Sequence, residues 1–271
     1  MMRTRAMRPD AAVLLLLLAE LALSLAAGMA GGVASRLLHY ASYLLPLALF
    51  LLFFAGQGCL ATQRPTVAGL RRVLPLLPIF LAAVMLVSTL TGSIMTALGL
   101  PTGGSAAEGG LGRQILQHAL VPAVLEELLM RLCVLSLLAG RSPARAVPQC
   151  ALLFALLHAS LYQLPYAFVG GLFLSLAALL GGSVLFAVLF HFTNNLLSLL
   201  LQRLPLWLGE QGGLAAQLAV TFMIFLLAGF SVLVLLRRKR KPLPSARGWL
   251  RELICSPLVV YVLLMLLYAC L

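Results

Sequence analysis

Long apolar stretches recur along the whole sequence, and they constrain the fold more than any other feature. The chain has 271 residues, of which 62% are hydrophobic and only 10% are charged, and its mean hydropathy is +1.08. A soluble domain is closer to half apolar and a quarter charged. Because a helix needs about 20 mostly apolar residues to cross a bilayer, the composition predicts an all-α, polytopic transmembrane helical bundle.

About eight or nine membrane spans can be separated along the chain by length and hydropathy. They are expected at 11–33, 39–56, 74–100, 114–139, 146–161, 163–181, 183–202, 214–236 and 253–271. The loop PTGGSAAEGGLG at 101–112 is the clearest flexible boundary. We therefore expect N-terminal transmembrane helices at 1–110, a core with intramembrane polar residues at 111–203, and C-terminal helices with a basic cytoplasmic loop at 204–271.

The net charge of +12 follows a pattern typical of membrane topology rather than of nucleic-acid binding. With a cytoplasmic N-terminus, fifteen Lys and Arg residues would face the cytoplasm and three would face outward. The run RRKRK at 237–241 is then a topology anchor, and basic and aromatic residues do not alternate as they do on nucleic-acid surfaces. We expect a multi-pass integral membrane protein whose partners include the lipid bilayer but no nucleic acid.

Three charged residues stand together inside an apolar span. Glu127 and Arg131 are four residues apart, so they lie on one helix face and can pair, which lowers the cost of burying both. Glu126 is rotated about 100° away from Glu127 and is left without an obvious local partner. We interpret one glutamate as neutralising the arginine and the other as available for general base catalysis. A further carboxyl, Glu20, lies in the first span and is assigned no role.

Two later spans carry histidines. His158 ends the stretch FALLH, and His191 begins HFTNN, which places Asn195 one turn further along the same helix face. A neutral imidazole can accept a proton or bind a metal, and a histidine with an amide beside it can donate to an oxyanion. Either histidine alone is as readily explained by a helix–helix hydrogen bond. At a rise of 1.5 Å per residue, Glu126, His158 and His191 can all meet near the middle of the bilayer.

These elements together resemble the CPBP family, the CAAX protease and bacteriocin-processing membrane proteins, which include the type II CAAX prenyl endopeptidases. The family pattern EExxxR, FxxxH and HxxxN reads EELLMR at 126–131, FALLH at 154–158 and HFTNN at 191–195. The resemblance covers residues 114–201. It departs from the frequent family sequence FRG, since this chain has Met130-Arg131-Leu132.

The resemblance implies an intramembrane endopeptidase. By position, Glu126 and His158 would activate the attacking water, and His191 and Asn195 would stabilise the oxyanion. Glu127 and Arg131 would shape the site. A peptide or a membrane protein would be the substrate, and the leucine-, alanine- and arginine-rich composition favours a bacterial plasma membrane.

The use of a metal is left open by the sequence. Family proteins are often labelled metalloproteases, and Glu126, His158 and His191 would supply enough ligands for zinc. The sequence has no HExxH motif, so a metal-free mechanism with a glutamate-activated water is the slightly favoured alternative.

Two other functions compete with proteolysis. A non-catalytic membrane scaffold or bacteriocin-immunity factor could keep the same fold while leaving Glu126 without a chemical role. A transporter could use Glu126, Glu127 and Arg131 for proton coupling, but the sequence has no internal repeat of the kind many transporters show.

Overall fold

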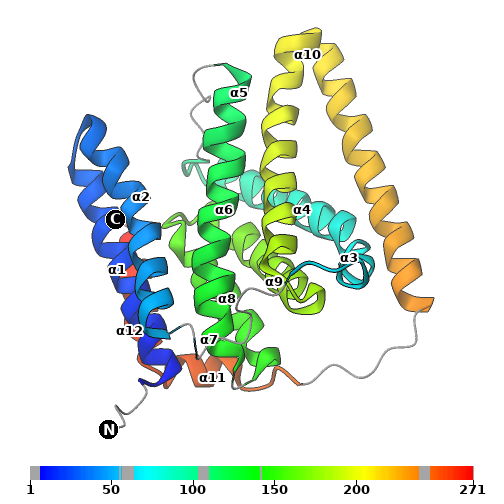
Figure 1. Cartoon of the computed structure of the whole chain (residues 1–271). Helices are drawn as coiled ribbons and strands as arrows, with labels where there is room; N and C mark the ends of the chain where they lie inside the picture. The colour runs from blue at the N-terminus through cyan, green and yellow to red at the C-terminus, as the bar shows by residue number, and fades with distance from the viewer. Residues whose placement is uncertain are drawn as a thin grey trace, which may run out of the picture.

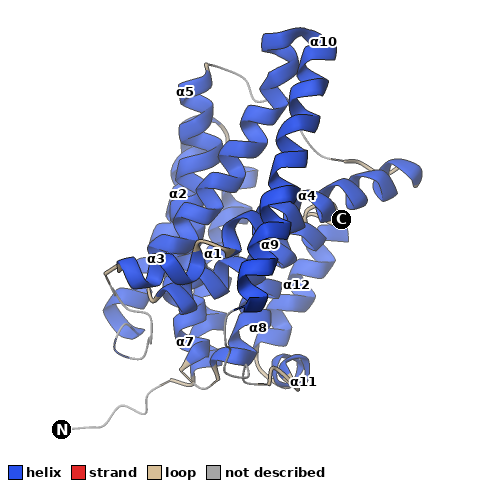
Figure 2. Cartoon of the chain, turned by 90° about the vertical axis from the view of Figure 1, so that its right-hand side faces the viewer, coloured by secondary structure: helices blue, strands red, loops and turns tan. Residues whose placement is uncertain are grey.

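The computed structural model describes residues 7–54, 56, 64–102, 110–140, 142–237 and 245–270. Within these ranges every regular element is a helix (Figure 2). Five of the described helices are long and apolar enough to cross a membrane: Pro9–Met29, Gly32–Phe54, Val67–Ala97, Leu164–Gly181 and Val184–Arg237. The predicted all-α polytopic fold is thus confirmed. Most of the predicted loop at 101–112 and of the basic run at 237–241 lies outside the described residues.

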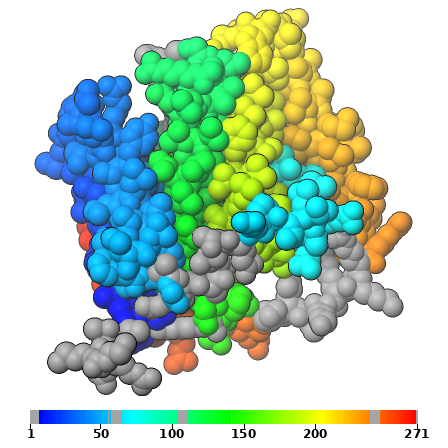
Figure 3. Space-filling view, viewed as in Figure 1, coloured from blue at the N-terminus to red at the C-terminus, as the bar shows by residue number. Residues whose placement is uncertain are grey.

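The N-terminal helices form a pair at one side of the molecule (Figure 1). Helix α1 (Pro9–Met29) packs along α2 (Gly32–Leu49), which continues into the π-helical turn η1 (Phe50–Phe54). Proline at the first position of α1 and an aspartate in its first turn both favour a helix start there. On the face shown in Figure 3 a notch separates the far ends of this pair from the neighbouring helix.

The neighbouring helix runs without interruption from 111 to 139 and contains the predicted span 114–139. It consists of α5 (Leu111–Gln114), η3 (Ile115–Leu120), α6 (Val121–Glu127), η4 (Leu128–Leu135) and α7 (Ser136–Ala139). The segments η3 and η4 are π-helical, a geometry that is rare and often found at functional sites. Glu126 and Glu127 are the last two residues of α6, where the helix changes from α-helical to π-helical geometry.

The next two helices form a hairpin that packs against η4. Helix α8 (Pro143–Leu157) stops before its C-cap residue His158, because Ala159 adopts a left-handed backbone with φ of +46°. Helix α9 (Leu164–Gly181) returns along α8 and ends where Gly182 adopts φ of +71°. The sequence placed the end of the first of these spans at 161; the left-handed residue ends the helix four residues earlier.

Helix α10 (Val184–Arg237) is a hairpin rather than two separate spans (Figure 1). Gly209, with φ of +72° and ψ of 168°, divides it into a first arm at 184–208 and a second arm at 210–237. The sequence predicted spans at 183–202 and 214–236 with a loop between them. The residues of that loop are helical on both sides of Gly209 instead. Gly213 allows the arms to meet, since a Cβ there would collide with the Pro205 backbone.

Helix α4 (Leu76–Ala97) follows the short α3 (Val67–Val73) and runs across the other long helices in both views (Figures 1 and 2). It contacts α9 and α10. The buried ring of Phe80 on α4 stacks on Phe190 of α10 at 5.9 Å and meets Phe173 of α9 at 6.0 Å. These rings fix the α10 backbone beside His191.

The C-terminal region closes the bundle at the end that holds the start of α1. The predicted span 253–271 is divided into α11 (Trp249–Ile254) and α12 (Leu258–Cys270). Gln149 donates a hydrogen bond to the Trp249 carbonyl at 3.1 Å, and Arg145 pairs with Glu252 at 3.2 Å. These contacts hold α11 against α8, while α12 packs on α1 and α8.

Candidate active site

The predicted pair of Glu127 and Arg131 is present and fully buried. An Arg131 Nη donates to Glu127 Oε1 at 2.9 Å, and both side chains have no exposed surface. Two charges without solvent are tolerated only when paired and further hydrogen-bonded. The pair therefore needs other partners, and the neighbouring helices supply them.

Arg131 connects its own helix to α8 and α9. Its second terminal nitrogen donates to the Gly171 carbonyl at 3.2 Å, and its guanidinium carbon lies 4.4 Å from the centre of the Phe154 ring. Gly171 permits this contact because α9 comes very close to α8 there; a Cβ on Gly171 would lie only 2.9 Å from the Ala151 Cα.

His191 is bound to the same carboxylate oxygen as Arg131. Its Nδ1 lies 2.8 Å from Glu127 Oε1, across 64 residues of sequence. Because that oxygen already accepts from Arg131, Glu127 acts as a carboxylate and the His191 Nδ1–H is the donor. The opposite nitrogen, Nε2, consequently points away from this buried pair and lies 4.0 Å from Glu126.

His158 presents its Nε2 to the same place from α8. Its Nδ1 lies 2.9 Å from the Phe154 carbonyl oxygen, which can only accept, so Nδ1 carries the proton. In the neutral ring Nε2 is then a free acceptor, and it lies 3.9 Å from Glu126 Oε2. The Phe154 ring meets the edges of both imidazoles, His158 at 4.9 Å and His191 at 5.8 Å.

Glu126 is thus the point on which two histidines converge. Its Oε2 has no hydrogen-bond partner among the described residues, and its side chain is 15% exposed, compared with 0% for Glu127. The separations of 3.9 and 4.0 Å are too long for direct hydrogen bonds and short enough for one bridging water. The predicted difference between the two glutamates is present in the geometry.

A cavity of about 470 Å³ opens onto this carboxylate. Glu126, His158, His191 and Asn195 all line it, so the structure brings these four predicted residues together. Glu127 and Arg131 lie behind them, away from the cavity. His118 is exposed and lines the cavity as well.

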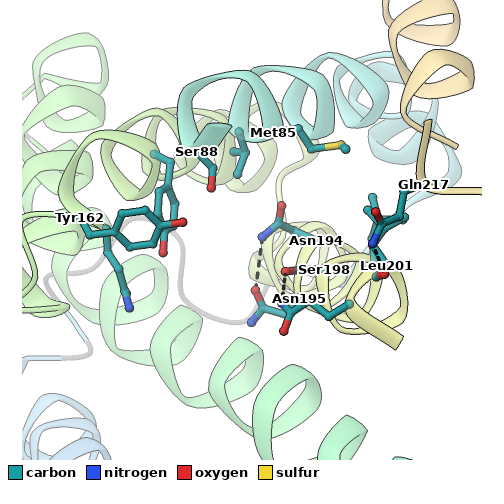
Figure 4. A pocket seen from close by; sticks show the side chains of 13 residues that line it. Met85, Ser88, Tyr162, Asn194, Asn195, Ser198, Leu201 and Gln217 are labelled. Atoms are coloured by element: carbon teal, nitrogen blue, oxygen red, sulfur yellow. Dashed lines mark hydrogen bonds between the residues drawn. The ribbon is translucent and has the colours of Figure 1, made fainter. Parts of the chain in front are cut away.

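Asn195 is oriented by its neighbour in the sequence. The Asn194 amide nitrogen donates to Asn195 Oδ1 at 3.3 Å (Figure 4). With its oxygen engaged, Asn195 has its own amide N–H groups available to the cavity. This is the orientation that an oxyanion donor requires.

Residues 111–197 match the family model described as type II CAAX prenyl endopeptidase, Rce1-like. The chain is similar to that family over these residues. The match contains all three polar motifs and supports an intramembrane protease of the CAAX type in general terms. Comparisons with curated proteins and with solved structures give no match.

The donor atoms of this site are of the types that bind zinc. One carboxylate and two imidazole nitrogens are ligands that catalytic zinc accepts. In the part of the chain that the structure describes, no group of three His, Cys, Asp or Glu side chains is close enough to hold a metal ion.

Several residues of the cavity that contains Glu126 were not predicted from the sequence. Ser198 and Gln202 continue the line of His191 and Asn195 along α10 at helical spacing, and Gln163 and Tyr166 come from the start of α9. The spacing i, i+4, i+7 and i+11 of these polar residues within an apolar helix was the available signal. Glu20 and Tyr43, from α1 and α2, lie within electrostatic range of Glu126.

Proposed function

We propose that this chain is an intramembrane endopeptidase in which Glu126 activates the attacking water. The observation that carries the proposal is the convergence of two imidazole nitrogens on the Glu126 carboxylate, at 3.9 and 4.0 Å, inside a polar cavity. A peptide segment of a membrane-associated protein is the substrate.

Water activation follows from the acceptor groups. A water between Glu126 and His158 gives one proton to the carboxylate and directs its other O–H to His158 Nε2. The water oxygen forms a bond to the scissile carbonyl carbon, and the carbonyl oxygen becomes an oxyanion. The C–N bond then breaks, and the proton held by Glu126 passes to the leaving amine.

The oxyanion is bound by Asn195 and His191. The Asn195 amide donates directly. His191 Nε2 can donate only when the ring carries both protons, and the Glu127 carboxylate beside its Nδ1 favours that form. Glu127 and Arg131 hold His191 in place and do not touch the substrate.

The role of a metal is the second part of the proposal, and we favour the metal-free mechanism. If zinc is used, Glu126, His158 and His191 would hold it, and it would supply Lewis-acid activation of water. Dialysis of the purified chain against a strong chelator, followed by zinc addition, tests this. Unchanged peptide hydrolysis supports glutamate activation, and loss with recovery on zinc addition shows that a metal is required.

The first experiment compares protein termini in cells that carry the wild-type chain, Glu126→Gln or Glu210→Gln. Glu210 is an exposed carboxyl at the turn of α10 and serves as the matched control. Termini in the membrane and secreted fractions that disappear only with Glu126→Gln would establish proteolysis and identify the substrate. Identical termini, with the variant stably inserted, would favour a non-catalytic scaffold or immunity factor instead.

A further inference from the structure

A second cavity adjoins the one that contains Glu126. It has a volume of about 440 Å³ and lies between α4, α9 and the first arm of α10, with Gln217 contributed by the second arm (Figure 4). We call it the flanking cavity. Asn195, Ser198 and Gln202 on α10, and two residues of α9, line both cavities. A ligand in the flanking cavity therefore lies next to the group that acts on the scissile bond.

The flanking cavity is lined by both polar and apolar residues and by no charged residue. Amides and hydroxyls from Ser88, Tyr162, Asn194 and Gln217 share the surface with aliphatic side chains. Such groups can pair with the N–H and C=O groups of an extended peptide. A prenyl chain could contact the aliphatic part of this surface but would make no hydrogen bond to its amides and hydroxyls.

We propose that the flanking cavity is a substrate subsite that holds an uncharged stretch of polypeptide beside the scissile bond. This inference rests on the proposed peptidase function and adds a preference of the enzyme for uncharged residues near the cleaved bond. The volume is within the range of about 300–1,000 Å³ found for ligand pockets. Because no lining residue can neutralise a charge, a Lys, Arg, Asp or Glu placed there would be desolvated without a partner.

Asn194 and Asn195 connect recognition to chemistry. Asn194 lines the flanking cavity but not the cavity that contains Glu126, whereas Asn195 lines both. Their side chains are hydrogen-bonded at 3.3 Å. A peptide that engages Asn194 therefore acts on the donor that we assign to the oxyanion.

Ser88 offers a sharp test, because its hydroxyl faces the flanking cavity from α4 (Figure 4). The purified full-length chain would be given synthetic ten-residue peptides in which one position at a time is varied. Ser88→Asp is expected to raise cleavage of peptides with Lys at one position by about tenfold, by charge neutralisation. Ser88→Asn, which matches aspartate in shape without its charge, is the control. Equal preferences of the two variants would overturn the proposal.

A binding measurement separates this inference from the proposed function. In a Glu126→Gln background, Ser88→Cys would be labelled with a small water-soluble maleimide in the presence of the same peptides. Uncharged peptides should slow the labelling at least fivefold and Lys-containing peptides should not. Thr89→Cys, next in sequence but outside the cavity, should be unaffected.

The outcomes can be told apart. Protection of Ser88→Cys without any cleavage by the wild-type chain would support the subsite and contradict hydrolysis. Cleavage without protection, and without a change of preference in Ser88→Asp, would contradict the subsite alone. Neither cleavage nor protection would contradict both.

Discussion

At the scale of single residues, two adjacent glutamates have different surroundings. Glu127 accepts hydrogen bonds from Arg131 and His191 on one oxygen and is completely buried. Glu126 has no hydrogen bond to its buried oxygen and faces two acceptor nitrogens across a cavity. The first glutamate therefore builds the site, and the second is available to exchange a proton with water.

Removal of the Arg131 guanidinium should cost far more than removal of an exposed arginine. Arg131→Met leaves the Glu127 charge and the Gly171 carbonyl buried without their partner, so the free energy of unfolding should fall by about 3–5 kcal/mol. Arg145→Met breaks a partly exposed pair with Glu252 and should cost at most about 1 kcal/mol. Denaturant unfolding in detergent would measure both, and similar losses would contradict the assigned role of Arg131.

Substitution of Asn195 should lower the catalytic rate and leave the stability of the fold largely unchanged. Asn195→Ala removes an oxyanion donor and should lower kcat about 10²–10³-fold. Thr193→Ala is the control, since the Thr193 hydroxyl donates only to the Leu189 carbonyl within its own helix. Steady-state kinetics on a cleaved peptide would check this, and a change confined to KM would show that Asn195 binds substrate without stabilising the oxyanion.

At the scale of elements, the close contact between α8 and α9 determines where the site groups lie. At Gly171 the two helices approach each other very closely, and the Gly171 carbonyl also accepts a hydrogen bond from Arg131. Any side chain at this position moves one helix relative to the other. A purely structural contact in the interior is thus linked to the orientation of His158, which stands at the end of α8.

Two adjacent glycines on α9 should respond differently to the same substitution. Gly171→Ala forces a Cβ to within 2.9 Å of the Ala151 Cα and should cost about 1–3 kcal/mol of stability together with most of the activity. In Gly170→Ala the new methyl would meet Val84 and Phe80 side chains at 3.6 and 3.7 Å, which are ordinary contacts. Thermal unfolding and peptide hydrolysis of the two variants provide the comparison. A tolerated Gly171→Ala would show that α8 and α9 can separate freely.

The end of α8 stores backbone strain beside a proposed catalytic group. Ala159 has a φ of +46°, a conformation that costs an L-residue about 1–2 kcal/mol and that glycine adopts readily. Ala159→Gly should raise the stability of the folded chain by up to about 1 kcal/mol, since the greater freedom of unfolded glycine offsets part of the gain. The melting temperature in detergent would record this, and a decrease would mean that the strain is compensated in the wild type.

At the scale of the whole molecule, the two ends of the bundle are chemically different. The start of α1, the α7–α8 connection and α11 lie at one end, and the turn of α10 lies at the other (Figure 1). This arrangement matches the topology expected from the distribution of basic residues, in which the first end faces the cytoplasm. The orientation in the membrane stays a prediction.

Labelling from one side of the membrane would test the orientation. With the native cysteines replaced by alanine, Glu210→Cys should react with an impermeant maleimide in intact cells, since it lies at the turn of α10. Ser142→Cys, at the start of α8, should react only after the cells are opened. The reverse pattern would place the N-terminus outside.

Much of this molecule could be predicted because membrane helices and polar motifs have strong periodic signals. The pairing of Glu127 with Arg131 followed from helical spacing, and the approach of His158 to Glu126 was expected from their depths. The crosswise position of α4 and the continuous arms of α10 could not be predicted, since hydropathy reports length and not direction. The hydrogen bond from Arg131 to the Gly171 carbonyl also could not be predicted, because every residue type has a backbone carbonyl.

One shared oxygen has a consequence for how such proteins can diverge. Glu127 Oε1 accepts hydrogen bonds from Arg131 of the first motif and His191 of the third. Loss of any one of these three side chains leaves buried polar groups without that hydrogen-bond partner. The Glu126 Oε2 atom has no such hydrogen bonds within the described part of the chain. A related protein that loses catalysis can therefore replace Glu126 at little cost in stability and keep the buried network. An intact Glu127–Arg131–His191 set in a related sequence would then indicate common ancestry and not activity.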